Sequence, residues 1–308
     1  MFSHRWIDMC TRHGLDMTVV DAPWGAGIPL DRYEDILRKD VNHEIKVVLA
    51  THNETATGVR SDIAGVRRAM DAAGHPALLY VDGVSSIGSM DFQMDAWGVD
   101  IAVTGSQKGF MLPAGLAIVA FSPKAVARTE TAGLARTFFD VRDMAAGYAN
   151  NAYPYTPAVG LLNGLKTSTE MLLEEGLEAV FARHTRIANG VRAAVDAWGL
   201  ALCAASPDLY SDTVSAIVTP QGFNATDIVT HAADVYDVAF GVGLGDVAGK
   251  VFRIGHLGSM TDVMALAGIA TAEMCMVDLG LDIQLGAGVA AAQESYRAST
   301  ADARRAAA

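Results

Sequence analysis

Short apolar runs alternate with amphipathic segments along the first half of the chain, and this alternation restricts the fold more than any other feature. Between two such runs, residues 60–74 place Ile63, Val66 and Met70 at helical spacing. Continuous apolar strands separated by helices indicate a mainly parallel sheet covered by helices on both faces. We therefore expect an α/β fold. The expected strands are residues 15–20, 45–50, 77–81, 100–104 and 115–121.

The pattern changes in the second half of the chain. Two long helical stretches meet near Glu175 and Gly176, and a smaller α/β unit then follows. Its expected strands, residues 213–219 and 250–255, flank a helix that Asn224 caps. We expect a large domain over residues 1–175 and a small C-terminal domain over residues 176–308. The tail after Gly286 is expected to form a terminal helix that frays.

Charge and composition exclude several classes of protein. The net charge is −12 and no long basic tract is present, which argues against nucleic-acid binding. No uncharged apolar run reaches the roughly 18 to 20 residues that a membrane span requires. The first residues lack the pattern of an export signal, and the three cysteines, Cys10, Cys203 and Cys275, are far apart. This usage is typical of reduced thiols in the cytoplasm, and the histidines show no metal-ligand spacing.

Polar groups follow three of the predicted strands. The segment 51–58, THNETATG, follows the first of these strands, Asp82 follows the second and Lys108 follows the third. Ligands of parallel sheets bind beyond the carboxyl ends of the strands, so we expect the three groups to face one crevice. One strand–helix–strand unit is expected to separate Asp82 from Lys108.

Each of these residues has an ordinary interpretation when it is considered alone. A lysine after a strand is commonly a solvated loop cation, and an aspartate followed by glycine commonly forms a turn. Together, Asp82 and Lys108 suit pyridoxal phosphate. A lysine amine forms an imine with its aldehyde, and a carboxylate beside the ring nitrogen keeps that nitrogen protonated.

Several longer motifs raise this hypothesis to a family resemblance. YVDGVSSIG at 80–88, VTGSQKGF at 103–110 and THNETATG at 51–58 resemble the class V aminotransferases of the fold-type-I pyridoxal-phosphate superfamily. The resemblance extends to NNAYPYTPAVGLLNGL and GKVFRIGHLG, and so covers residues 2 to 285. It is nearest to the bacterial serine–, aspartate– and alanine–glyoxylate aminotransferases. Such an enzyme uses pyridoxal 5′-phosphate to move an amino group from serine, aspartate or alanine to glyoxylate, giving glycine.

The resemblance implies roles for five residues around the cofactor. Lys108 resembles the Schiff-base lysine and Asp82 the partner of the pyridine nitrogen. Val84 resembles the residue that packs on one face of the ring. Thr55 resembles the hydroxyl that contacts the phenolic oxygen, and Gln107 one of the phosphate ligands.

Three further residues have roles implied by the same resemblance. Tyr153 and Thr156 resemble a pair that reaches across a homodimer interface to the neighbouring subunit's phosphate. Arg253 resembles the anchor of the substrate α-carboxylate, and a planar guanidinium suits that task because it can donate two parallel hydrogen bonds.

The resemblance also leaves alternatives open. Family members extend upstream of the position that matches Met1 and carry a phosphate-binding loop there, so we expect this chain to be a fragment, a mis-started version or a shortened product. A truncated, non-catalytic module remains one alternative. A cysteine desulfurase or related lyase is another, although such enzymes usually have a histidine where Gln107 stands and use a loop cysteine near the substrate.

Overall fold

The first sheet of the protein holds four strands. The computed structural model describes the backbone over residues 1–306 and side chains over residues 1–299. The strand order is β1-β4-β5-β6. Strands β1 (Val47–Thr51), β4 (Leu78–Asp82) and β5 (Ile101–Gly105) are parallel, whereas β6 (Ala117–Phe121) runs antiparallel to β5. The expected mainly parallel sheet is therefore confirmed.

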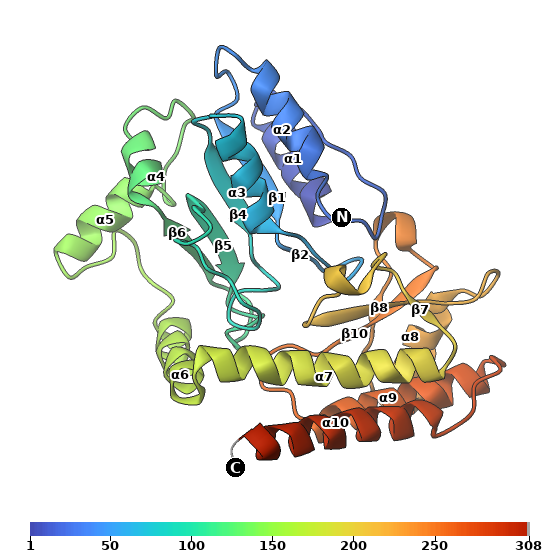
Figure 1. Ribbon diagram of the computed structural model, residues 1–308. Coiled ribbons are helices and arrows are strands. Elements are labelled where there is room, and N and C mark those ends of the chain that lie inside the picture. Colours follow the sequence, from blue (N-terminus) through green and yellow to red (C-terminus); the bar gives the residue numbers. More distant parts are fainter. Residues whose placement is uncertain (307–308) are drawn as a thin grey trace.

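Helices cover both faces of this sheet (Figure 1). Helices α2 (Leu30–Lys39) and α3 (Ile63–Ala72) bury Leu37, Ile63, Val66 and Met70 in one core with Leu79 and Val81 of β4. Tyr80 points the other way, because neighbouring strand residues alternate between faces. Its ring contacts Trp6 of α1 (Phe2–Arg12), with ring centroids 4.9 Å apart. Helix α3 begins at Asp62, whose side chain accepts a hydrogen bond from the Gly65 N–H.

A second, antiparallel sheet lies in the C-terminal half, with strand order β7-β8-β10-β9. Its central pair is β8 (Val214–Val218) and β10 (Val251–Gly255), and the short β7 (Ala201–Leu202) and β9 (Gly241–Val242) lie at the edges. Side chains from both central strands enter a core with residues of α7 (Leu177–Ala197), α8 (Ala225–Tyr236), α9 (Asp262–Asp278) and the C-terminal helix.

The helix after Gly286 is α10 (Ala287–Ala306), and it lies along α7 (Figure 1). Gly190 of α7 permits this contact, because a Cβ there would lie 2.2 Å from ring atoms of Tyr296. Tyr296 is only 4% exposed, so α10 is packed where the side chains are described. Over residues 287–299 the tail therefore forms a packed helix, whereas we expected the tail after Gly286 to fray, and the side chains beyond residue 299 lie outside the described part of the chain.

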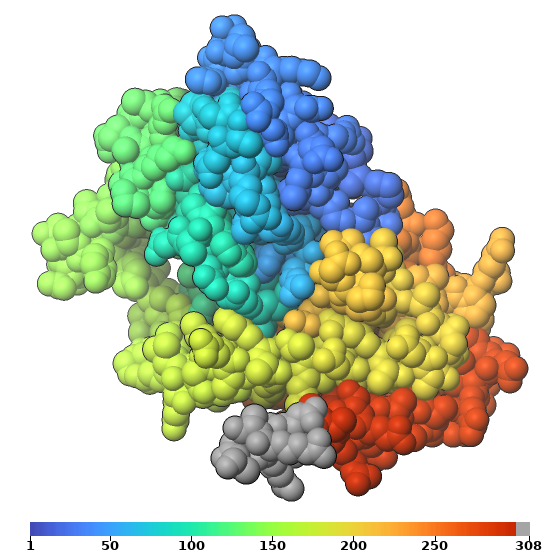
Figure 2. Space-filling view, viewed as in Figure 1, coloured from blue at the N-terminus to red at the C-terminus, as the bar shows by residue number. Residues whose placement is uncertain are grey.

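Other details of the second half agree with the sequence. Helix α6 (Val159–Glu175) ends where α7 begins, at Gly176, whose φ of 84° suits glycine. Asn224 caps α8 by accepting a hydrogen bond from the Thr226 N–H. Figure 2 shows yellow and gold elements of the second half packed directly against the blue and cyan part of the chain, with the red elements on their far side. The remaining elements are α4 (Pro123–Arg128), α5 (Val141–Ala149), β2 (Asn53–Glu54), β3 (Val59–Arg60), η1 (Pro207–Leu209) and η2 (Gly245–Val247).

Two expectations about the first half are wrong. Residues 15–20 form no strand, because no neighbouring segment pairs with them, and Leu15 and Val19 remain 42% and 41% exposed. The connection from β4 to β5 consists of turns instead of a helix. Its first part, GVSSIGS at 83–89, is rich in glycine and serine, which favour turns.

Within residues 1–306, no helix combines the length and the apolar composition that crossing a bilayer requires.

Candidate active site

The carboxyl ends of β1, β4 and β5 bring the predicted groups together. Thr51 pairs with Asp82 at the end of β1 and β4, and Asp82 in turn pairs with Val103 of β5. Lys108 lies in the turn that follows β5, and its charge interacts with the Asp82 carboxyl group. Both residues therefore lie at the carboxyl end of the parallel strands, close enough for their charges to interact, and we call the region between them the crevice.

Asp82 is a buried carboxyl group held by the backbone. It is 8% exposed, and its Oδ1 accepts a hydrogen bond of 2.9 Å from the Val84 N–H. Burial is the largest influence on its pKa and raises it, and the nearby Glu54 carboxylate raises it further. The Val84 hydrogen bond and the Lys108 charge oppose this rise. A cation at the crevice therefore stabilises the ionised form of Asp82.

Lys108 is half-buried, and close packing of two loops sets its position. At the next residue, Gly109, a Cβ would lie 2.2 Å from the Ile87 carbonyl oxygen, so only glycine lets this turn approach the loop after β4. Burial lowers the Lys108 pKa most, the Arg253 charge lowers it further, and Asp82 opposes both. A lowered pKa increases the fraction of neutral amine, which is the form that attacks carbonyl groups.

Arg253 reaches the same crevice from β10 of the second sheet. Its Nε donates to the Val242 carbonyl at 2.9 Å, and its Nη1 donates to the Thr55 carbonyl at 3.0 Å. Gly241 lies opposite Arg253 in the ladder, and a Cβ there would lie 3.1 Å from the Arg253 Nε. Burial lowers the Arg253 pKa, and the Glu54 carboxylate opposes that shift. No hydrogen bond from the Arg253 Nη2 is found among the described residues, which leaves its N–H groups available to a ligand.

A buried hydrogen-bond network lies behind the crevice. The Thr55 hydroxyl donates to the Ser85 hydroxyl at 2.9 Å, and Ser85 donates to the Asn53 carbonyl. The Asn53 Nδ2 donates to Ser85 and, at 2.8 Å, to the Thr213 hydroxyl. The Thr213 hydroxyl donates to the Ser85 carbonyl at 2.9 Å. Of these residues, only Thr55 was predicted from the sequence as a site residue, although Asn53 and Ser85 lie inside the motifs at 51–58 and 80–88.

The remaining predicted residues are less closely tied to this crevice. Val84 is half-buried two residues after Asp82, and Gln107 is exposed beside Lys108. Tyr153 is 61% exposed, and Thr156 is exposed as well. Among the described residues, neither of them has a hydrogen bond or charge interaction with the crevice groups. Within the described part of this chain, the structure therefore does not link Tyr153 or Thr156 to Lys108 by a hydrogen bond or a charge interaction.

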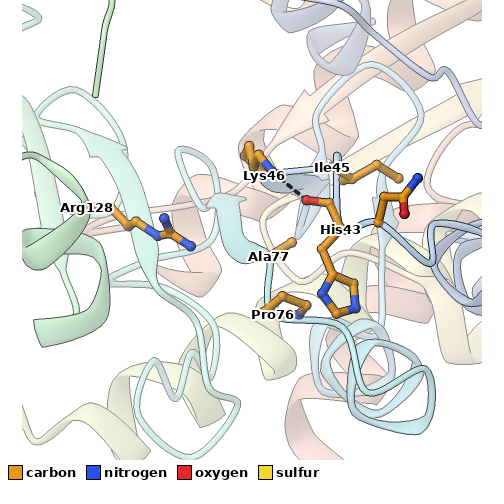
Figure 3. Close-up of a pocket in the computed structure, with 7 residues that line it drawn as sticks. His43, Ile45, Lys46, Pro76, Ala77 and Arg128 are labelled. Atoms are coloured by element: carbon orange, nitrogen blue, oxygen red, sulfur yellow. Dashed lines mark hydrogen bonds between the residues drawn. The ribbon is translucent and has the colours of Figure 1, made fainter. Parts of the chain in front are cut away.

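A separate cavity of about 270 Å³ lies at the other end of the first sheet. Figure 3 shows His43, Ile45 and Lys46 on one side of it and Arg128 across from them. Residues 45 and 46 precede β1, and Ala77 precedes β4, so this cavity adjoins the amino ends of the strands. It is therefore not part of the strand-end crevice.

Cys203 and Cys275 do not have the properties of reactive thiols. Cys275 is fully buried in α9, and burial raises its pKa to about 11, which keeps the thiol protonated. Burial also raises the pKa of the Cys203 thiol. Neither thiol has the lowered pKa that a cysteine nucleophile of a desulfurase would need.

Comparison with known proteins agrees with the motifs. The family described as Aminotransferase class-V matches residues 3–244. The chain is 75% identical over 308 residues to an L-aspartate–glyoxylate aminotransferase of Paracoccus denitrificans, covering 100% of this chain and 78% of that protein. It is 56% identical over 297 residues to a serine–glyoxylate aminotransferase of Hyphomicrobium methylovorum, covering 96% of this chain and 73% of that protein. A crystal structure of pyridoxamine-pyruvate aminotransferase from Mesorhizobium loti aligns with a TM-score of 0.85 and 32% identity, covering 91% of this chain and 71% of that one. The family match and these identities confirm the resemblance, and the chain belongs to the class V aminotransferases.

Proposed function

We propose that this protein is a pyridoxal 5′-phosphate-dependent aminotransferase that moves an amino group from an L-amino acid to glyoxylate. The products are glycine and a 2-oxo acid, and the donor is aspartate, serine or alanine. One observation carries the proposal: Lys108, in the turn that follows β5, lies close enough to the buried Asp82 at the end of β4 and to Arg253 of β10 for its charge to interact with both. The names of the two similar proteins, which specify aspartate and serine as donors, support the same reaction.

The residues present suit the cofactor. Asp82 has one oxygen bound to the backbone, which leaves the other for a protonated ring nitrogen. Lys108 would bind the aldehyde covalently, Val84 would pack on the ring and Gln107 would contact the phosphate. Thr55 would offer its hydroxyl to the phenolic oxygen. When bound, pyridoxal phosphate withdraws electrons from the substrate and so makes its Cα–H bond acidic.

The protein's own groups then have distinct tasks. The guanidinium of Arg253 holds the donor's α-carboxylate, which fixes the orientation of the Cα–H bond. The Lys108 Nζ takes the proton from Cα, and its lowered pKa makes it available as a base. The Asp82 carboxylate provides the fixed negative charge that balances a protonated ring nitrogen.

We further propose that the enzyme is a homodimer. Tyr153 and Thr156 would complete the phosphate site of a second copy, which accounts for their exposure to solvent in a single chain. Exposed aromatic side chains in the same region support this, since Phe139 is 79% and Tyr148 85% exposed.

The proposal also includes a division into two domains, at residues 1–175 and 176–308. It includes a cytoplasmic location as well, because the cysteines are unpaired.

The test compares Lys108→Ala with a matched lysine variant. Lys166→Ala is the control, because Lys166 lies exposed on α6 and pairs only with Glu170 in the described structure. Glycine formation from glyoxylate is measured with aspartate, serine and alanine, and covalent attachment of pyridoxal phosphate is measured by mass after borohydride reduction. We expect Lys108→Ala to lose both and Lys166→Ala to keep both. Transamination that persists in Lys108→Ala would contradict the proposed function.

A further inference from the structure

Thr213 connects the two sheets through a single hydroxyl group. It directly precedes β8 and is completely buried. Its hydroxyl donates to the Ser85 carbonyl at 2.9 Å and accepts from the Asn53 Nδ2 at 2.8 Å. Ser85 belongs to the loop after β4, and Asn53 lies in the short β2 within the loop region that follows β1. Thr213, at the start of a strand of the second sheet, therefore holds two loop regions of the first sheet.

Both loops carry groups of the candidate active site. The loop of Ser85 begins at Asp82, and the Val84 N–H between them binds the Asp82 carboxylate. The loop of Asn53 continues to Thr55, whose carbonyl accepts a hydrogen bond from Arg253. The hydrogen bonds of Thr213 therefore reach the segment that carries Asp82 and the segment whose carbonyl binds Arg253.

The strand that follows Thr213 is paired with the strand that carries Arg253. Val214 pairs with Gly255, and Ala216 pairs with Arg253 itself. A shift at the start of β8 is transmitted to β10 through this ladder, because paired strands move together. The position of the Arg253 guanidinium thus depends on where β8 is held against the first sheet.

We propose that Thr213 is a positioning residue that sets the placement of Arg253 relative to Asp82 and Lys108. This inference rests on the proposed function, in which Arg253 holds the donor's α-carboxylate. A hydroxyl group is required because it donates and accepts at once. Valine has nearly the same shape but can do neither, and it leaves the buried Ser85 carbonyl and an Asn53 N–H without this partner.

The experiment uses Thr213→Val, Thr213→Ser and one matched control. Thr219 lies at the other end of β8, is 7% exposed, and donates its hydroxyl to the carbonyls of Phe223 and Lys250. Thr219→Val therefore removes a buried hydroxyl from the same region without touching the crevice. The apparent KM and kcat for the amino donor are measured for each full-length chain loaded with pyridoxal phosphate. Amide hydrogen exchange is measured without cofactor.

We expect Thr213→Val to raise the donor KM about tenfold and to change kcat less than about threefold, since it displaces a binding group and leaves the base in place. Thr213→Ser restores the donor KM, and Thr219→Val keeps it at the wild-type value. In the cofactor-free chains, amides of residues 53–58 exchange faster in Thr213→Val than in wild type, and Thr219→Val leaves them unchanged.

Three results would overturn the proposal. They are an unchanged KM in Thr213→Val, an equal rise of KM in Thr219→Val, and a failure of Thr213→Ser to restore KM. A wild-type chain that forms no glycine contradicts the proposed function instead. The exchange comparison then decides alone, and equal exchange in Thr213→Val and wild type overturns the positioning role.

Discussion

The strongest prediction about stability concerns Glu273, a carboxylate of α9 that is only 2% exposed. Its Oε1 accepts from the Trp198 Nε1 at 3.0 Å and from the N–H groups of Gly288 and Val289, and its Oε2 accepts from the Gly286 N–H. Gly288 and Val289 lie in the first turn of α10, where N–H groups have no partner inside the helix. Glu273 thus fixes the start of α10, and its negative charge interacts favourably with the positive end of the helix dipole.

The expected cost of Glu273→Ala follows from the donors that it leaves without a partner. Trp198 and Gly288 are buried, and an unsatisfied buried donor costs about 1–3 kcal/mol. The more exposed Gly286 N–H can bind water instead. We therefore expect a loss of about 4 kcal/mol in the free energy of unfolding, within a range of about 2–6 kcal/mol.

Urea unfolding followed by circular dichroism measures this loss. Glu273→Gln should be less destabilising, because one oxygen remains as an acceptor while the amide N–H₂ meets other donors. The control is Glu174→Ala on the exposed side of α6, for which we expect a change within about 0.5 kcal/mol. A loss below about 1 kcal/mol for Glu273→Ala would refute the reasoning that these donors depend on the carboxylate.

Two other predictions test the crevice and its surroundings. Gly241→Ala places a Cβ 3.1 Å from the Arg253 Nε, so we expect the KM for the amino donor to rise about fivefold in steady-state kinetics. Gly255→Ala is the control, because a Cβ there meets open space, and it should leave this KM unchanged. Burial, and then the Arg60 charge, lower the His52 pKa to about 4. Below about pH 6.5 the unfolded chain therefore binds a proton that the folded chain does not, and the free energy of unfolding falls as the pH drops towards 4. In urea unfolding between about pH 7 and 5, His52→Phe should reduce the pH dependence of the free energy of unfolding by up to about 1.4 kcal/mol per pH unit, and an unchanged pH dependence would contradict the lowered pKa.

Local signals in the sequence were sufficient for much of the fold. The runs that became β1, β4 and β5 are apolar and short, and strands buried on both faces have this pattern. The break between α6 and α7 was visible because Gly176 interrupts two helical patterns, and its φ of 84° explains the choice of residue. Residues 15–20 look similar but stay unpaired, because strand formation depends on a partner that the local pattern does not specify.

The candidate site was predictable only in part, for a related reason. Asp82 and Lys108 follow parallel strands, so a general rule about strand ends brings them together. Thr213 contacts residues 128 and 160 positions away, and a threonine before a strand gives no sign of such contacts. The signal for Arg253 came from family motifs alone, and its contact with the Thr55 carbonyl depends on how the two sheets pack.

The amine of Lys108 and the guanidinium of Arg253 are carried by different sheets, and this separation affects how donor preference can change. The distance between the two groups is set by sheet packing instead of by one rigid element. A misplacement on the order of 1 Å can alter an enzymatic rate about 100-fold. Substitutions far from the crevice can therefore shift the balance between a short and a long donor while every residue that touches the donor stays the same. A search for the determinants of amino-donor choice in this family must include the residues that pack β8 and β10 against the first sheet.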